Sequence, residues 1–232
     1  MQALSRLTVV VPVGPGDSLT RELRAQLSAL PAAAEVCVVG CDGPDMEAIR
    51  ASLQSAGGPQ WRCLLSPPGR AAQQNAGAAA ATRPWLWFLH ADTLLAPETL
   101  TALGRWLERE TPALGYFDLR FIDDGPALMH LNAIGAWLRS RVLGLPFGDQ
   151  GLVLPRAVFD RLGRFDEALA AGEDHALVWR ARRAGVALRP LRAPLYTSAR
   201  KYAEHGWGAT TAWHLRETWK QARQFARPER RQ

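Results

Sequence analysis

The amino-acid sequence predicts an α/β fold in which helices flank a mostly parallel, Rossmann-like sheet. Short apolar runs alternate four times with helical patterns over residues 1–110 of the 232-residue chain, and this alternation is typical of right-handed parallel βα units. The composition is 47% apolar and includes nine tryptophans, which favours a buried core and excludes a mainly disordered chain. A chain of this length accommodates one sizeable domain.

The first half reads as four strand–helix pairs. Residues 7–13 form a nearly continuous β-branched run, as in a buried parallel strand. Asp17 or Ser18 can cap the following helix, and Pro31 ends it. In order, we expect strands at 7–13, 35–39, 62–65 and 85–89, and helices at 19–30, 45–56, 70–82 and 98–110.

The second half is less regular. Gly185 stops one helix at its C-terminal cap, and a basic helix comes last. We expect strands at 115–123, 186–191 and 195–198, a loop followed by a strand over 148–154, and helices at 128–143, 156–162, 173–184 and 207–225. The expected organisation is one domain over residues 1–205, followed by a basic helix or tail over 206–232.

Charge is distributed unevenly along the chain. Residues 1–116 carry 9 arginines against 10 acids, whereas residues 117–232 carry 19 basic residues against 12 acids. This imbalance indicates that the C-terminal part meets an anion, whether phosphate, nucleic acid or an acidic membrane face. A solvated basic face is the alternative.

Cysteine usage and hydropathy bear on the compartment. Cys37, Cys41 and Cys63 make up neither a disulfide framework nor a zinc quartet. No run reaches the ~18–20 apolar residues of a membrane span. We therefore expect a cytoplasmic protein, with the inner face of the membrane as a further location.

Ligands of parallel sheets bind beyond the carboxyl ends of the strands, and the loops there exclude two enzyme classes. None contains the Gly-x-Gly-x-x-Gly fingerprint of NAD enzymes or the Gly-Lys-Ser/Thr of phosphate-loop ATPases. The strand at 85–89 runs into His90-Ala91-Asp92, and the two-residue period places His90 and Asp92 on one side of the chain. An imidazole and a carboxylate converging at a strand end suit Mn²⁺ or Mg²⁺. Alternatively, Asp92 only caps the next turn.

A second pair of acids, Glu173 and Asp174, opens the helix expected at 173–184. The helix macrodipole stabilises carboxylates at this position, so simple capping is one interpretation. The other is a general base, which needs an ionised carboxylate aimed at open space.

Taken in order, these segments resemble the family 2 glycosyltransferases, which have the GT-A fold. The resemblance is carried by Thr8-Val9-Val10-Val11-Pro12-Val13, the strand and acidic loop at 35–45, Arg70-Ala71-Ala72-Gln73-Gln74-Asn75-Ala76-Gly77, His90-Ala91-Asp92, Gly148-Asp149-Gln150-Gly151 and Gly172-Glu173-Asp174. His-Ala-Asp-Thr at 90–93, Gly-Asp-Gln-Gly at 148–151 and Thr-Ser-Ala-Arg-Lys at 197–201 most resemble a compact subgroup often labelled arsenosugar-biosynthesis glycosyltransferases.

The resemblance implies a metal-dependent, inverting transfer of a sugar from a nucleotide-diphosphate sugar, first of all a UDP-sugar, to a hydroxyl of a small-molecule or lipid-linked acceptor. It implies that Asp92 binds Mn²⁺ or Mg²⁺, and that Asp174, with Glu173 beside it, supplies the catalytic base. Residues 1–110 would then bind the nucleotide sugar and residues 111–205 the acceptor. The residues implied to bind the nucleotide sugar are Pro12, Val13, Asp42, Arg70, Asn75, His90 and Gln150.

Two departures from the family pattern keep other functions open. Gly40 stands where many relatives have a base-binding Asp, and His90 replaces the first Asp of the Asp-x-Asp motif. A non-catalytic sugar-nucleotide-binding protein is one alternative. A nucleic-acid-binding protein is another, but no recognised binding motif is present, so we expect no nucleic-acid partner. The basic, aromatic-bearing segment at 207–231 would suit peripheral contact with a membrane.

Overall fold

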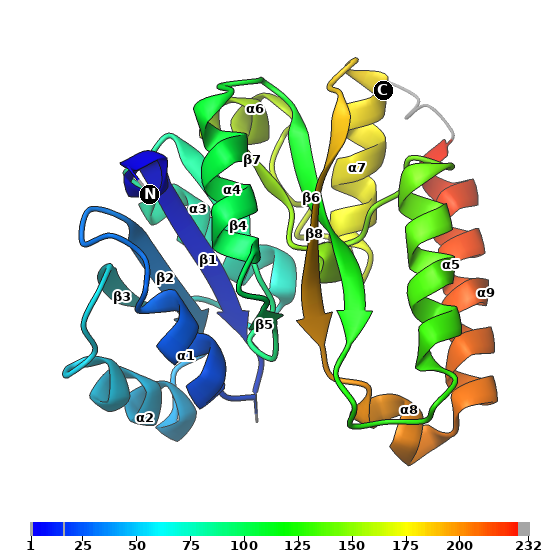
Figure 1. Ribbon diagram of the computed structural model, residues 1–232, viewed down its shortest axis with the longest axis horizontal. Coiled ribbons are helices and arrows are strands. Elements are labelled where there is room, and N and C mark those ends of the chain that lie inside the picture. The colour runs from blue at the N-terminus through cyan, green and yellow to red at the C-terminus, as the bar shows by residue number, and fades with distance from the viewer. Residues whose placement is uncertain (1, 16, 227–232) are drawn as a thin grey trace.

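The computed structural model describes residues 2–15 and 17–226, whose strands join in one sheet with helices on both faces (Figure 1). The order across the sheet is β3-β2-β1-β4-β7-β6-β8-β5. In chain order the strands are β1 (Leu7–Val13), β2 (Glu35–Gly40), β3 (Gln60–Leu65), β4 (Trp85–Phe88), β5 (Leu94–Leu95), β6 (Leu114–Phe121), β7 (Val153–Pro155) and β8 (Leu188–Thr197).

The helices lie between these strands and after the last one. Two are short 3-10 helices, η1 (Gln2–Arg6) and η2 (Gly148–Gln150). The α-helices are α1 (Arg21–Leu27), α2 (Pro44–Leu53), α3 (Arg70–Ala80), α4 (Thr99–Glu108), α5 (Met129–Arg141), α6 (Arg156–Arg161), α7 (Glu173–Arg183), α8 (Arg200–His205) and α9 (Trp207–Ala226). Within the described ranges, no helix is long and apolar enough to cross a membrane.

Most strand pairs are parallel, as the alternation of strands and helices predicts. β1 pairs in parallel with both β2 and β4, and β2 pairs in parallel with β3. β7 lies antiparallel between β4 and β6, whereas β6 and β8 are parallel. The short β5 runs antiparallel to β8 at the edge. The predicted mostly parallel α/β sheet is confirmed.

The β-branched run of β1 forms the centre of two cores, one on each face of the sheet. All seven of its residues are buried. Val9 and Val11 pack into the core under α1, α2 and α4, whereas Val10 faces the core under α3, α6 and α7. Gly77 of α3 sits directly on this second face, because a Cβ there would lie 2.5 Å from Val10 Cγ1.

Three parts of the secondary structure differ from the sequence prediction. The N-cap of α1 is Thr20, whose hydroxyl accepts from Leu23 N at 3.2 Å, and not Asp17 or Ser18. The strands expected at 186–191 and 195–198 are one strand, β8, because a register shift against β6 and a left-handed Arg192 (φ 57°) absorb the irregularity. The short elements β5 and α8 were not predicted, since two and six residues carry too little periodicity.

Candidate functional site

The candidate site lies at the carboxyl end of the sheet, where segments far apart in sequence meet. They are the start of α3, the turn after β4, η2 and the first turn of α7. The imidazole of His90 interacts electrostatically with Arg70 and Asp174. Asp149 in turn interacts with Asp174 and Asp92. The structure therefore brings together the residues that the sequence singles out in three separate motifs.

The segment that carries His90 and Asp92 is a turn. β4 ends at Phe88, and the amide of Thr93 donates to His90 O at 3.2 Å. The strand period used to predict the placement of both side chains does not apply here, because β4 ends before His90. Asp92 is half-buried, and no hydrogen bond or ion pair to its carboxylate is found in the described part of the chain. This carboxylate is open to a ligand.

His90 is held in its neutral form. Burial lowers the pKa of its imidazole to about 3, and the positive charges of Arg70 and Lys201 lower it further, while Asp174 opposes them. A neutral imidazole keeps a lone pair on one ring nitrogen. His90 can therefore accept a hydrogen bond or bind a cation at neutral pH.

The carboxylate of Asp174 has a fixed orientation in the first turn of α7. Its Oδ2 accepts from the amide of Gly148, and its Oδ1 accepts from the amide of His175 at 2.8 Å. A Cβ at position 148 would lie 2.9 Å from Oδ2, so this approach needs glycine. The two amide donors hold the carboxylate in one position beside the loop at 148–150.

The neighbouring acids repel one another. The Glu173 side chain is buried, and burial followed by the charge of Asp174 raises its pKa. Burial also raises the pKa of Asp149, and both Asp174 and Asp92 add to the effect. The Oδ1 atom of Asp149 is buried and has no hydrogen-bond partner among the described residues. Such a group of carboxylates favours the binding of positive charge.

A divalent cation fits these donors only if its ligand supplies further oxygens. Among residues 2–15 and 17–226, no group of three or more His, Cys, Asp or Glu side chains is arranged to hold a metal. The open carboxylate of Asp92 and the neutral imidazole of His90 remain as two candidate donors. Hard divalent cations take six or more ligands, commonly including phosphate oxygens. The donor set suits a cation shared with a bound diphosphate.

Sequence reasoning missed Arg139, which reaches the site from α5. Its guanidinium lies 3.4 Å from the ring centroid of Phe147, and its Nε donates to Leu145 O at 3.0 Å. It interacts electrostatically with Asp149 and Asp174, and burial lowers its pKa. One arginine among the several of this basic second half gives no sequence signal, so only the tertiary packing identifies it.

Two residues expected to bind the nucleotide sugar instead support the loops around the site. The Gln150 side chain is fully buried; its Nε2 donates to Phe117 O at 2.9 Å, and its Oε1 accepts from Arg139 and the Phe147 amide, each at 3.2 Å. Both polar atoms of the Gln150 side chain therefore bond within the protein, and the buried side chain holds Phe117, Phe147 and Arg139 together.

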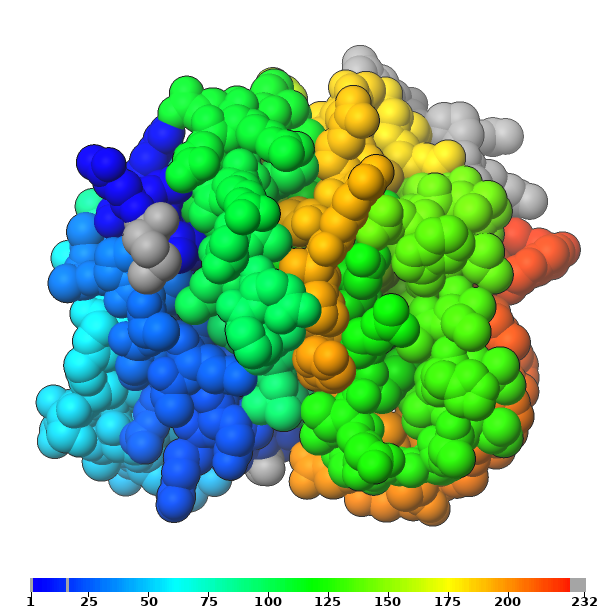
Figure 2. Space-filling view, in the orientation of Figure 1, coloured from blue at the N-terminus to red at the C-terminus, as the bar shows by residue number. Residues whose placement is uncertain are grey.

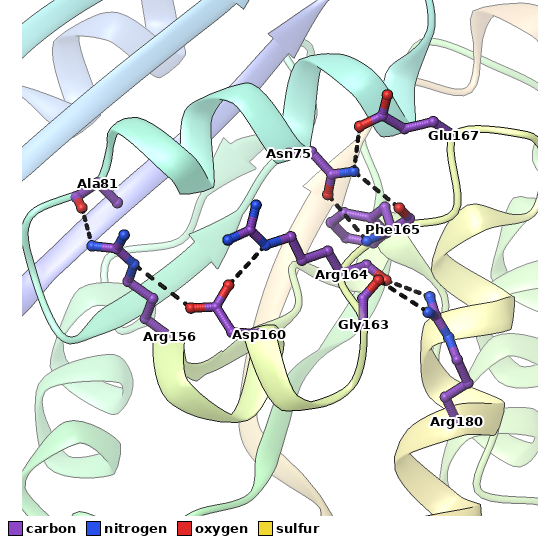
Figure 3. A network of polar contacts seen from close by, with 9 residues as sticks. All are labelled: Asn75, Ala81, Arg156, Asp160, Gly163, Arg164, Phe165, Glu167 and Arg180. Carbon is purple, nitrogen blue, oxygen red and sulfur yellow. Dashed lines mark hydrogen bonds and ion pairs between the residues drawn. The ribbon is translucent and has the colours of Figure 1, made fainter.

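Asn75 anchors the segment between α6 and α7 (Figure 3). It donates to Phe165 O at 2.9 Å and Glu167 Oε1 at 2.7 Å, and its Oδ1 accepts from the Phe165 amide at 3.0 Å. The nearby Asp160–Arg164 pair, at 2.8 Å, braces the same turn. Asn75 thus shapes the loop that leads to Glu173.

The ends of β1 and β2 lie beside this cluster. Pro12 and Val13 are buried, and Val13 O accepts from Gln73 Nε2 of α3 at 2.8 Å. Asp42 is exposed in the loop after β2. A Cβ at Gly40 would lie 2.5 Å from Met46 Sδ, so Met46 fills the space that a larger residue at position 40 would need. This arrangement is compatible with a nucleotide-binding pocket in which Asp42 supplies the carboxylate.

A cavity of about 270 Å³ opens between the loop before α3 and the loop before α7. Arg70 lies on one side of it and Glu173 on the other. Ligand pockets commonly measure ~300–1,000 Å³, so this cavity is large enough for one part of a nucleotide sugar.

Comparisons with solved structures confirm the fold. The N-terminal 349 residues of S. aureus TarS in complex with UDP-GlcNAc align with a TM-score of 0.63 and 18% identity, covering 83% of this chain and 58% of that one. The mannosyltransferase PcManGT from Pyrobaculum calidifontis, in complex with GDP-Man and Mn²⁺, aligns with a TM-score of 0.65 and 21% identity, covering 90% of this chain and 61% of that one. The chain therefore spans about three fifths of the length of these neighbours. No curated protein matches the sequence significantly.

A sequence model of one family covers most of the residues that build the site. The model described as Glycosyl transferase family 2 matches residues 20–165, which is more than half of the chain. The matched range includes Arg70, His90, Asp92 and Asp149. It ends before Glu173 and Asp174, which the fold places beside them. The chain belongs to glycosyl transferase family 2.

Proposed function

We propose that this protein transfers a sugar from a nucleotide-diphosphate sugar to an acceptor hydroxyl. The observation that carries the proposal is the meeting of Asp92, His90 and Asp174 at the carboxyl end of a sheet whose family membership is established. Structural neighbours were solved with UDP-GlcNAc, UDP and GDP-Man. Residues 1–110 would bind the donor and residues 111–205 the acceptor. The expected 206–232 tail is partly outside the described residues, which end at Ala226.

Asp174 is the proposed general base. It takes the proton of the acceptor hydroxyl while the hydroxyl oxygen forms a bond to the anomeric carbon. The bond from that carbon to the diphosphate oxygen breaks on the opposite face, so the configuration inverts and a nucleoside diphosphate leaves. The hydrogen bonds from the amides of Gly148 and His175 support this role, because they hold the carboxylate in place.

The remaining residues are proposed to bind the donor. Asp92, with His90, would hold Mn²⁺ or Mg²⁺, and such a cation would supply positive charge to the departing diphosphate. Arg70, at the start of α3 and facing the cavity, is placed to contact phosphate. Pro12, Val13 and Asp42 would border the nucleoside. Asn75 and Gln150 act through the loops that they hold.

Two finer predictions stay open. The subgroup resemblance carried by residues 90–93, 148–151 and 197–201 would be tested by the choice of acceptor. A cytoplasmic location likewise stays a prediction. The alternative of a non-catalytic sugar-nucleotide-binding protein is favoured by Met46, which occupies the space beside Gly40. A sugar-transfer assay distinguishes this alternative from an enzyme.

The test is sugar transfer by the native chain and the variant Asp174→Asn across UDP-, GDP- and dTDP-sugars with and without Mn²⁺. Loss of a general base is expected to lower kcat by ~10²–10⁴-fold, while the melting-temperature rise caused by the donor persists. Glu108→Gln, an exposed acid of α4, is the matched control and should transfer normally. Native-like transfer by Asp174→Asn would refute the base. Donor binding without any transfer by the native chain would favour the non-catalytic alternative.

A further inference from the structure

The outer side of α5 is apolar and uncovered. Its inner side chains, including Met129 and Ala133, are buried. Leu131, Ile134, Leu138 and the C-cap Val142 point outward and are between 46% and 68% exposed. Their spacing of three or four residues forms one stripe along the helix. A helix that is apolar on both sides normally lies in a core, so this outer stripe calls for a partner.

α9 runs beside α5 on the same side of the molecule (Figure 1). Asn132 joins them: its Oδ1 accepts from Trp207 Nε1 at 2.7 Å, and its Nδ2 donates to Thr211 Oγ1 at 3.1 Å. Trp213 and Trp219 of α9 are 58% and 63% exposed. In Figure 2, α5 (green, right) lies at the surface, with α9 (orange to red) at the edge behind it. We call the α5 stripe (Leu131, Ile134, Leu138, Val142) and the two tryptophans the α5–α9 face.

Cations accompany the tryptophans on α9. Arg216, Lys220 and Arg223 are exposed, and the Arg223 guanidinium lies 3.9 Å from the Trp219 ring centroid. Tryptophan beside basic residues on a helix with an apolar side is typical of segments that lie in a membrane interface. The apolar rings enter the acyl boundary, and the cations reach the headgroups.

Charge decides between a bilayer and a second copy of the chain. Within the sequences of α5 and α9 there is a single acid, Glu217, and it already lies 3.7 Å from Lys220. A two-fold interface would place the same face against itself, so the cations would meet cations without carboxylates to balance them. Anionic headgroups supply the missing negative charge.

We propose that the α5–α9 face binds the surface of an anionic lipid bilayer, with both helices lying in the interface. The sequence alone suggests only the C-terminal helix for such contact; the structure adds the uncharged stripe of α5. This binding does not depend on the proposed transfer reaction.

The test measures binding of the full chain to vesicles of phosphatidylcholine alone or mixed with phosphatidylglycerol, without any nucleotide sugar. We expect co-sedimentation with the anionic vesicles only, weakened by salt. Each cation near an anionic surface contributes roughly fivefold to affinity, so Arg216→Gln, Lys220→Gln and Arg223→Gln together should lower binding by about a hundredfold. The control variant removes the same number of positive charges away from the α5–α9 face. It combines Arg21→Gln, Arg50→Gln and Arg105→Gln, whose side chains are exposed on α1, α2 and α4.

The apolar contribution is tested by Ile134→Gln with Leu138→Gln. These side chains are exposed, so the fold should persist, as circular dichroism would verify, while vesicle binding falls. No binding to anionic vesicles by the native chain overturns the proposal, as does equal loss in the control triple variant. A native dimer that the Ile134→Gln, Leu138→Gln variant converts to a monomer would show that a second copy covers the face instead. Binding to duplex DNA but not to vesicles would also overturn it.

Discussion

Gly148 positions the proposed base, and the variant Gly148→Ala tests this directly. The new Cβ would lie 2.9 Å from Asp174 Oδ2 and 3.3 Å from Asp174 Cβ. The first contact is about 0.5 Å closer than ordinary van der Waals packing. Because the clash falls on the end of a side chain, Asp174 can rotate away at little cost to the fold. The rotation would, however, break the hydrogen bond from the Gly148 amide.

The expected effect is on the chemical step. A displacement of this order in a reacting group can cost about a hundredfold in rate, so kcat should fall by about that factor. The KM for the donor sugar should change little, because Gly148 and Asp174 lie on the acceptor side of the proposed site. Stability should fall by no more than the ~1.5–3 kcal/mol of one hydrogen bond to a charged group.

The assay combines steady-state transfer kinetics with thermal unfolding. The control is Gly104→Ala in α4, where the nearest atom to a new Cβ is Leu4 Cγ at 3.9 Å. This variant should keep native kcat and gain ~0.5–1 kcal/mol in stability, because alanine favours the helix interior. Native kcat in Gly148→Ala would refute the positioning of Asp174 by this loop. A parallel loss of kcat and stability in both variants would show a general packing effect.

Three other predictions concern the core and the metal. Glu35 is 1% exposed and accepts from Thr8 Oγ1 at 2.7 Å and Thr82 N at 2.9 Å; burial raises its pKa, but these hydrogen bonds outweigh it and the net pKa is lowered. Glu35→Gln should therefore lower the free energy of unfolding by ~1–3 kcal/mol at pH 7. In urea unfolding, the difference in free energy between the native chain and the variant should shrink as the pH falls below 4.5 and through the lowered pKa of folded Glu35. A difference that stays constant with pH would contradict this explanation. Gly77→Ala should lower stability by ~1–3 kcal/mol by overpacking against Val10, and unchanged thermal unfolding would contradict the close approach of α3 to β1. Asp92→Ala should abolish Mn²⁺-dependent nucleotide binding in calorimetry, whereas tight binding that still needs Mn²⁺ would place the metal elsewhere.

The sequence predicts the fold well because its main signals are local. The β-branched run of β1 and the alternation after it need no tertiary information to indicate a parallel sheet. Where a local signal misleads, a specific contact explains it. The sequence predicts two strands, at 186–191 and 195–198, yet the register shift opposite β6 lets one strand continue.

The candidate site was predictable only where a motif marks it. Asp92 and Asp174 stand out by their neighbours in the sequence, whereas Arg139 comes from the side of a helix and is recognised only by what it contacts. Gln150 shows the opposite case: it belongs to a conspicuous motif, but its side chain is buried and both of its polar atoms bond within the protein. A motif gives the position of a side chain in the chain, and packing decides whether it faces the ligand.

The basic residues of the second half of the chain have three different roles. Arg139 serves the site, where its positive charge attracts the carboxylates of Asp149 and Asp174. Others hold the fold together: Arg141 pairs with Asp118 at 2.7 Å, and Arg182 donates to Leu143 O at 2.8 Å.

The outward cations of α9 fit neither use. Among the described residues, Lys220 pairs with the neighbouring Glu217 alone, and Arg216 and Arg223 have no ion pair. Solvated cations scattered over a surface would need no explanation, but these three share a helix with two exposed tryptophans beside the uncharged stripe of α5. Positive charge and apolar surface are each common on proteins. Their occurrence together on two neighbouring helices matches an anionic bilayer, and the phosphates of a soluble donor sugar would leave the apolar part unexplained.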